Sequence, residues 1–130
     1  YMSLSTIETD RPGNTYTADT LAQIYDSYKK IYFIIGADSL LYIQDWYHPE
    51  YICSHCHLLC ANRDNNSASV LIDQKHFLAD KYGAVIDFID VPELPYSSTD
   101  IRKKVAMGLS VKEDVGEEVE EYIKSRKLYV

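Results

Sequence analysis

Three short apolar runs, separated by segments of helix length, restrict the fold of this sequence more than any other feature. The runs cover residues 31–35, 58–61 and 84–89, and the last includes one charged residue, Asp87. Strands that are apolar without polar alternation are typical of parallel sheets, whose two faces are both covered. Strands that alternate with helices of about ten residues form βαβ units with helices on both faces. The sequence therefore predicts an α/β fold with a mostly parallel sheet.

The segments between these runs predict the helices. Apolar side chains recur at helical spacing over residues 17–28. A helix is predicted over 48–56, with Pro49 in the first turn, where its missing N–H costs little. Further helices are predicted over 71–81, 98–107 and 115–124, and a first strand over 2–8 that ends in the turn residues 10–14.

The last predicted helix carries an acidic run and an apolar stripe. The acidic side chains are expected to form its solvated face: Glu117, Glu118, Glu120 and Glu121. The apolar side chains are expected to face the core: Val115, Val119, Tyr122 and Ile123.

Composition excludes several classes of protein. A chain of 130 residues is expected to form one domain, residues 1–130. Its net charge of −7 disfavours nucleic-acid binding, which needs a basic field. No apolar run approaches the roughly 18–20 residues of a membrane helix, so no membrane partner is expected. Three cysteines, an odd number, favour a reducing compartment, and a cytoplasmic location is expected.

Polar residues follow the first apolar run, and ligands of parallel sheets lie beyond the carboxyl ends of strands. Gly36 has no Cβ, so a ligand can approach the backbone there. Asp38 is placed to accept hydrogen bonds from ribose hydroxyls. The alternative is a tight turn in which Asp38 caps a helix.

Trp46 and Tyr47 form the second candidate cluster. Trp46 is the only tryptophan, and an aromatic ring near a strand-end crevice can stack on a flat heterocycle. Tyr47 adds a polar tip on an aromatic body. The alternative is that Trp46 belongs to the core.

Hydroxyl residues at two predicted helix starts form further candidates. Ser98 and Thr99 begin one helix, and Arg102 lies one turn further on the same side. Helix N–H groups and a guanidinium together suit an anion. The alternative is an ordinary cap with Arg102 paired to a surface carboxylate. Tyr16 and Thr17 occupy the start of the first helix.

Cys53, Cys56 and His57 match C-x-x-C-H, the attachment signature of c-type haem. With Cys60 nearby, the same residues are also zinc-ligand types. The segment ends an amphipathic helix and leads into a buried strand, where cysteine behaves as a small hydrophobe. We interpret the cluster as structural.

Taken together, the motifs resemble the bacterial nicotinate-mononucleotide adenylyltransferases of the nucleotidyltransferase superfamily. The resemblance rests on residues 15–21, 34–40, 45–46 and 97–102 in this order, and on the C-terminal residues 119–123 and 128–129. It implies a Rossmann-like domain that joins ATP to nicotinate mononucleotide in NAD biosynthesis. The implied products are deamido-NAD and pyrophosphate, and the implied cofactor is Mg²⁺, held mainly by the ATP phosphates.

The resemblance also implies how the mononucleotide is bound. Trp46 would stack on the nicotinate ring, and Tyr47 would help to recognise the ring carboxylate. Tyr16 and Thr17 would line the mononucleotide pocket. Arg63 lies where the family often has an arginine, and it is carried over as a substrate-binding residue.

For ATP, the resemblance implies two groups of residues. Gly36 and Asp38 would hold a ribose of the adenylyl half. Ser98, Thr99 and Arg102 would bind the phosphates.

One part of the family pattern is absent from this sequence. The family begins with an H-x-G-H motif whose histidines contact the ATP phosphates, whereas the four histidines here lie elsewhere: His48, His55, His57 and His76. We therefore expect an N-terminally truncated domain and assign no catalytic residue. Two alternatives stay open: another adenylyltransferase of the superfamily, such as the phosphopantetheine enzyme, and a non-catalytic nucleotide-binding domain. Self-association into a homo-oligomer is also left open.

Overall fold

The computed structural model describes residues 2–28, 30–62, 68–92 and 95–130. They form two compact units, Tyr1–Pro92 and Glu93–Val130, and each unit is described by itself. The expectation of a single domain over residues 1–130 stays a prediction.

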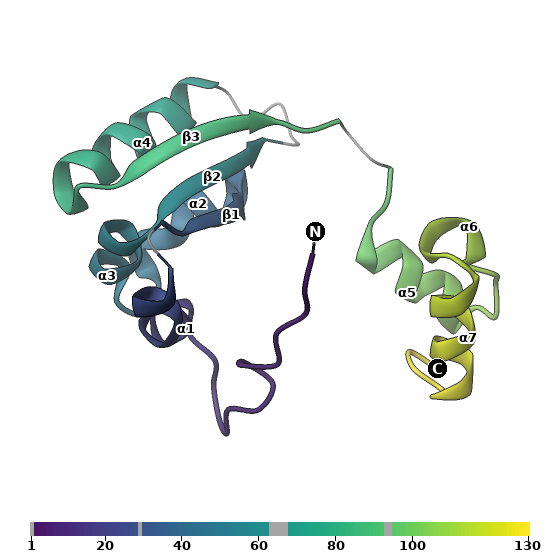
Figure 1. Ribbon diagram of the computed structural model, residues 1–130. Coiled ribbons are helices and arrows are strands. Elements are labelled where there is room, and N and C mark those ends of the chain that lie inside the picture. The colour runs from purple at the N-terminus through teal and green to yellow at the C-terminus, as the bar shows by residue number, and fades with distance from the viewer. Residues whose placement is uncertain (1, 29, 63–67, 93–94) are drawn as a thin grey trace. The chain divides into compact units, whose positions relative to one another are not determined.

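The first unit is a three-stranded parallel sheet with helices (Figure 1). Its strands lie in the order β1-β2-β3, and all three arise from the predicted apolar runs. The predicted parallel α/β architecture is confirmed. In chain order its elements are α1 (Thr17–Ile24), a 3₁₀ turn (Tyr25–Ser27), β1 (Tyr32–Gly36), α2 (Ala37–Tyr42), a 3₁₀ turn (Ile43–Asp45), α3 (Pro49–His55), β2 (His57–Asn62), α4 (Ala68–Tyr82) and β3 (Val85–Asp90).

The register brings the carboxyl ends of the strands to one edge of the sheet. Gly36 pairs with Ala61, and Ala61 pairs in turn with Ile89. The end of β1, where Gly36 leads directly into α2, therefore lies beside the ends of its two neighbours. This is the edge at which ligands of parallel sheets are expected.

The core lies between one face of the sheet and the helices. Ile35, Leu58 and Ile86 are buried on that face. They belong to one cluster with helix side chains, among them Leu40, Ile52 and Leu78. Burial of these side chains is the main stabilising contribution to the unit.

The opposite face of the sheet is exposed in this unit. Tyr32, Ile34 and Val85 alternate with the buried residues along their strands, and each is half exposed or more. The apolar runs also predict helices that cover this second face, and that part of the expected fold stays a prediction.

The prediction of a strand over residues 2–8 is wrong. Residues 2–6 have no regular structure, and a turn begins at Ile7. Met2 and Leu4 are almost fully exposed. A strand needs a neighbour to satisfy its backbone groups, and none of the described segments pairs with these residues.

The second unit consists of three helices, α5 (Ser98–Ala106), α6 (Lys112–Val115) and α7 (Glu117–Ser125). The single helix predicted over 115–124 is divided at Gly116, whose φ of 87° lies in the left-handed region that favours glycine. Val111 and Ile123 are buried in this unit.

The predicted faces of the last helix are partly wrong. Glu120 is buried rather than solvated. It accepts hydrogen bonds from the Ser110 hydroxyl (2.6 Å) and the Val111 N–H (2.8 Å). Val119 and Tyr122, expected in the core, are about half exposed in this unit. These polar contacts turn the helix so that Glu120 and Ile123 face inward.

None of the helices described is both long and apolar enough to cross a membrane.

Candidate functional site

A cavity of about 380 Å³ in the first unit brings together the side chains predicted for the mononucleotide. Tyr16 and Thr17 come from the start of α1, and Trp46 and Tyr47 from the turn before α3. The remaining lining residues are Thr15, Asp45 and Ile52. Arg63, the fifth predicted substrate residue, lies outside the described residues.

A short turn and a helix start hold these side chains in place. Trp46 directly follows a 3₁₀ turn, and its N–H donates to the Ile43 carbonyl at 3.1 Å. The fully buried side chain of Ile43 anchors that turn in the core. Tyr16 caps α1 with its backbone carbonyl, which accepts the N–H groups of Asp19 and Thr20. The aromatic side chains are therefore carried on segments that the core and a helix start hold in place.

Trp46 lies against the core and also at the wall of the cavity. Its ring meets Phe33 edge-on, with centroids 6.4 Å apart, and it packs against the core cluster. It also lines the cavity and is only partly buried. The indole is thus held by the core and still presents surface to a ligand.

Tyr16 and Tyr47 lie against each other at the cavity wall. Their ring centroids are 4.6 Å apart with planes tilted by 34°. Both side chains are exposed, so their hydroxyl groups can reach a polar ligand. Asp45 also lines the cavity, although it is not one of the predicted site residues. Its carboxylate repels anions, and none of the seven lining residues is positively charged.

Gly36 and Asp38 meet at the carboxyl edge of the sheet. A Cβ on Gly36 would lie 2.6 Å from Asp38 Oδ1, so glycine leaves room for the carboxylate to fold back over the end of β1. Asp38 is exposed and lies in the first turn of α2, and α2 has no side-chain capping bond. The alternative of Asp38 as a helix cap is therefore not observed.

Ser98, Thr99 and Arg102 lie exposed at the start of α5. No side chain caps this helix. Lys103 Nζ lies 3.8 Å from Asp100 Oδ1, whereas Arg102 forms no ion pair with any residue that the structure describes. The alternative of Arg102 paired to a surface carboxylate is thus not seen. These residues belong to the second unit, so their proximity to Gly36 and Asp38 stays a prediction.

The cysteine cluster is buried and reduced. Cys53, Cys56 and Cys60 are free thiols. Burial raises the pKa of Cys53 to about 11 and that of Cys56 to about 12, so both keep their protons at neutral pH. Cys56 Sγ donates to the Ile52 carbonyl at 3.1 Å. Among the described residues no group of three or more His, Cys, Asp or Glu could hold a metal ion. The structural interpretation is supported.

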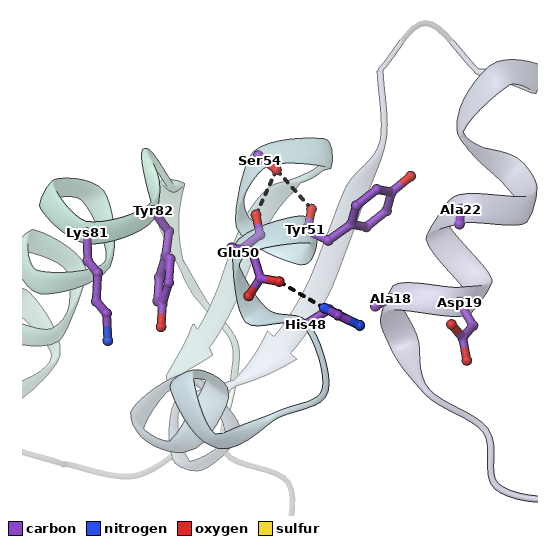
Figure 2. Close-up of a pocket in the computed structure, with 9 residues that line it drawn as sticks. All are labelled: Ala18, Asp19, Ala22, His48, Glu50, Tyr51, Ser54, Lys81 and Tyr82. Carbon is purple, nitrogen blue, oxygen red and sulfur yellow. Dashed lines mark hydrogen bonds and ion pairs between the residues drawn. The ribbon is translucent and has the colours of Figure 1, made fainter.

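A second cavity, of about 550 Å³, lies between α1, α3 and α4 (Figure 2). Sequence reasoning did not predict it. His48 and Glu50 stand in its wall, with His48 Nδ1 2.9 Å from Glu50 Oε1. The hydrogen bond to His48 holds the pKa of Glu50 below its usual range. Both cavities have aromatic side chains in their walls, and we take the smaller one as the candidate site because four of the predicted residues line it.

The sequence model of the cytidylyltransferase-like family matches residues 2–104, which is most of the chain. This chain belongs to that family. Family membership agrees with the parallel α/β sheet of the first unit. The match covers the first unit from residue 2 onward and reaches residue 104, in the first part of the second unit.

Curated relatives in this family carry a more specific name. A probable nicotinate-nucleotide adenylyltransferase of Thermoanaerobacter sp. is 38% identical over 99% of this chain and 63% of its own length. One from Lachnoclostridium phytofermentans is 35% identical over 100% of this chain and 66% of its own length. The chain therefore spans somewhat less than two thirds of the length of these relatives.

Among solved structures, the fold resembles Plasmodium falciparum nicotinic acid mononucleotide adenylyltransferase, which was determined in complex with APC. The TM-score is 0.67 at 18% identity, covering 91% of this chain and 60% of that one. At this identity the likeness supports the fold, and the predicted nucleotidyltransferase-like fold is confirmed.

Proposed function

We propose that this chain provides the mononucleotide site, and part of the ATP site, of a nicotinate-nucleotide adenylyltransferase. The observation that carries the proposal is the cavity in which Tyr16, Thr17, Trp46 and Tyr47 meet. These residues come from separate segments, and the sequence motifs had assigned them to one ligand. The names of the curated relatives support the same activity.

The chemistry of the cavity suits a pyridine ring with polar substituents. The indole of Trp46 offers a flat face for stacking, and its packing on Phe33 limits its reorientation. The phenol groups of Tyr16 and Tyr47 can donate hydrogen bonds to a carboxylate or a phosphate. Because Asp45 repels anions, we expect the acid group of nicotinate to lie on the tyrosine side of the cavity.

Adenylyl transfer then needs mainly positioning and charge stabilisation. A phosphate oxygen of the mononucleotide attacks the α-phosphorus of ATP, and the bond from that phosphorus to the departing pyrophosphate breaks. Arg102 and the N–H groups at the start of α5 would stabilise charge on the phosphate oxygens. Asp38 would accept hydrogen bonds from ribose hydroxyls and so orient the nucleotide.

The residues proposed for the ATP site can bind phosphate and leave the metal ion to be held by ATP itself. Hydroxyls, helix N–H groups and a guanidinium bind phosphate, and Mg²⁺ in such sites is held largely by phosphates and water. When bound, Mg²⁺ would neutralise charge on the phosphates. Ser98, Thr99 and Arg102 would orient the same phosphate chain.

Ligand binding tests the proposal directly, because Trp46 is the only tryptophan and reports on its own site. We expect nicotinate mononucleotide to quench its fluorescence in a saturable way. Phosphopantetheine should have no effect at the same concentration. Binding of phosphopantetheine instead would favour the other adenylyltransferase, and binding of neither would contradict the mononucleotide site.

Replacement of Trp46 tests the stacking role. Trp46→Ala should chiefly raise the KM for the mononucleotide in the adenylyl-transfer reaction, because the stacking face is lost. Trp46→Phe retains an aromatic face and part of the contact with Phe33, and should be intermediate. An unchanged KM in Trp46→Ala would remove this residue from the pocket.

A further inference from the structure

His48 lies in the chain beside a residue of the smaller cavity and lines the larger one, and it is not assigned to either ligand. It follows Tyr47, which lines the smaller cavity, and precedes Pro49, the first residue of α3. Its own side chain lines the larger cavity (Figure 2). A residue in this position can couple the geometry of the aromatic wall to that of α3.

The backbone of His48 adopts an uncommon conformation. Its φ of 51° and ψ of 58° are left-handed, although residues other than glycine rarely have positive φ. Such a conformation persists where the surroundings determine it. Here the His48 carbonyl accepts the N–H groups of Tyr51 (3.1 Å) and Ile52 (3.2 Å), which fixes the start of α3.

The imidazole of His48 has contacts on two sides. Nδ1 lies 2.9 Å from Glu50 Oε1, as the dashed line in Figure 2 shows. The ring also meets that of Tyr47 nearly at right angles, with centroids 4.1 Å apart and an angle of 72°. Glu50 therefore anchors the imidazole, and the imidazole supports the Tyr47 ring.

Tyr47 is about half exposed, so contacts with neighbouring rings can decide its rotamer. It also contacts Tyr16, with ring centroids 4.6 Å apart. The rings of Tyr16, Tyr47 and His48 thus form a row of contacts, in which Tyr47 contacts both of the others. Loss of the outer ring at His48 frees Tyr47 to leave the cavity wall.

We propose that His48 is a positioning residue for the mononucleotide site, which holds the Tyr47 ring against Tyr16 where the pyridine ring would bind. The proposal rests on the proposed function for its ligand. Its structural part, the ordering of Tyr47, concerns the ligand-free chain and can be tested separately.

His48→Asn is the informative variant. Asparagine tolerates the left-handed backbone but has no ring to support Tyr47. We expect the Kd for nicotinate mononucleotide, measured by Trp46 fluorescence, to rise roughly threefold to tenfold, the factor for losing one aromatic pair. The Kd for ATP should not change. His76→Asn, the same substitution at an exposed position of α4, is the matched control and should leave both constants unchanged.

A double-mutant cycle with Tyr47→Ala shows whether His48 acts through Tyr47. If it does, His48→Asn has no further effect on mononucleotide binding once the Tyr47 ring is absent. Additive effects of the two substitutions would overturn the proposal, since His48 would then contribute independently.

Nuclear Overhauser effects between the rings of Tyr16 and Tyr47 in the ligand-free chain separate this proposal from the proposed function. We expect them in the wild type and in His76→Asn, and a marked loss in His48→Asn. Their survival in His48→Asn would overturn the positioning role whatever the ligand. If the effects behave as expected but wild type does not bind the mononucleotide, the proposed function fails and the role in ligand binding falls with it.

Discussion

Trp46 and Arg102 are the side chains on which the proposed chemistry depends most, and the fold holds them differently. Trp46 is packed on Phe33 and the core, so its ring is largely preorganised. Arg102 is exposed on α5 and forms no ion pair within the described part of the chain. A guanidinium held in this way contributes little to folding and is available for phosphate.

Removal of the Arg102 guanidinium should therefore affect catalysis far more than stability. For Arg102→Ala in the complete protein we expect kcat of adenylyl transfer to fall roughly 100-fold or more, as for loss of a group that stabilises developing charge. The Tm should hardly change, because surface substitutions usually alter stability little. Lys103→Ala, a neighbouring exposed cation, is the control and should retain kcat. Near-normal turnover of Arg102→Ala at saturating ATP would contradict the assignment.

Glu120 illustrates a charged residue whose role is structural. Hydrogen bonds from Ser110, Lys124 and the Val111 N–H lower its pKa from 4.5 to about 2. The carboxylate is thus stabilised in the folded state. Its contribution to stability is fully present above pH 4.5 and is lost as pH falls from 4.5 toward 2.

This linkage predicts acid sensitivity in the second unit. Between pH 4.5 and 2 the free energy of unfolding of the wild type should fall. In Glu120→Gln it should be lower at neutral pH and should vary less over this range. Denaturant unfolding at several pH values measures both quantities, with exposed Glu118→Gln as the control. An equal pH dependence in wild type and Glu120→Gln would contradict the role.

At the scale of elements, the junction of β1 and α2 determines where the Asp38 carboxylate lies. A Cβ at position 36 would occupy the space that Asp38 Oδ1 now uses. Because Oδ1 lies at the end of a flexible side chain, a small residue at position 36 should displace the Asp38 carboxylate without disrupting the sheet.

Gly36→Ala should accordingly weaken ATP binding with little loss of stability. In the Asp38→Ala background the same substitution has no carboxylate to displace and should add nothing to the Kd for ATP. Titration calorimetry of the four proteins gives the comparison. A large fall in Tm for Gly36→Ala, or an ATP affinity equal to that of wild type, would show that Asp38 does not depend on this glycine.

The elements also show what the sequence could predict. Largely apolar runs identified all three strands, because interior parallel strands have few polar positions. The strand predicted over residues 2–8 has no pairing partner among the described segments, and a single sequence does not reveal partners. The burial of Glu120 is not predicted by the sequence for a related reason. Its carboxylate accepts hydrogen bonds from Ser110 and Val111, which lie outside the helix.

The candidate site was predictable through the resemblance to a known family rather than from single motifs. The resemblance implied one pocket for Tyr16 and Trp46, and the structure brings both to one cavity. The row of rings from Tyr16 to His48 was not predicted, because it depends on a left-handed backbone at His48 and on side-chain rotamers.

At the scale of the whole molecule, a net charge of −7 opposes the approach of anionic nucleotides. If the proposed function is right, binding of the mononucleotide must therefore depend on local groups rather than on the overall charge. The groups that the structure brings together for it are the aromatic side chains of the cavity in the first unit. The central claim is that this cavity binds the nicotinate ring of a mononucleotide.

A crystal structure of the protein with deamido-NAD bound tests this claim most directly. We predict that the nicotinate ring lies on the indole of Trp46, with the phenol groups of Tyr16 and Tyr47 beside it. A structure in which the nicotinate ring contacts none of these three side chains would contradict the claim.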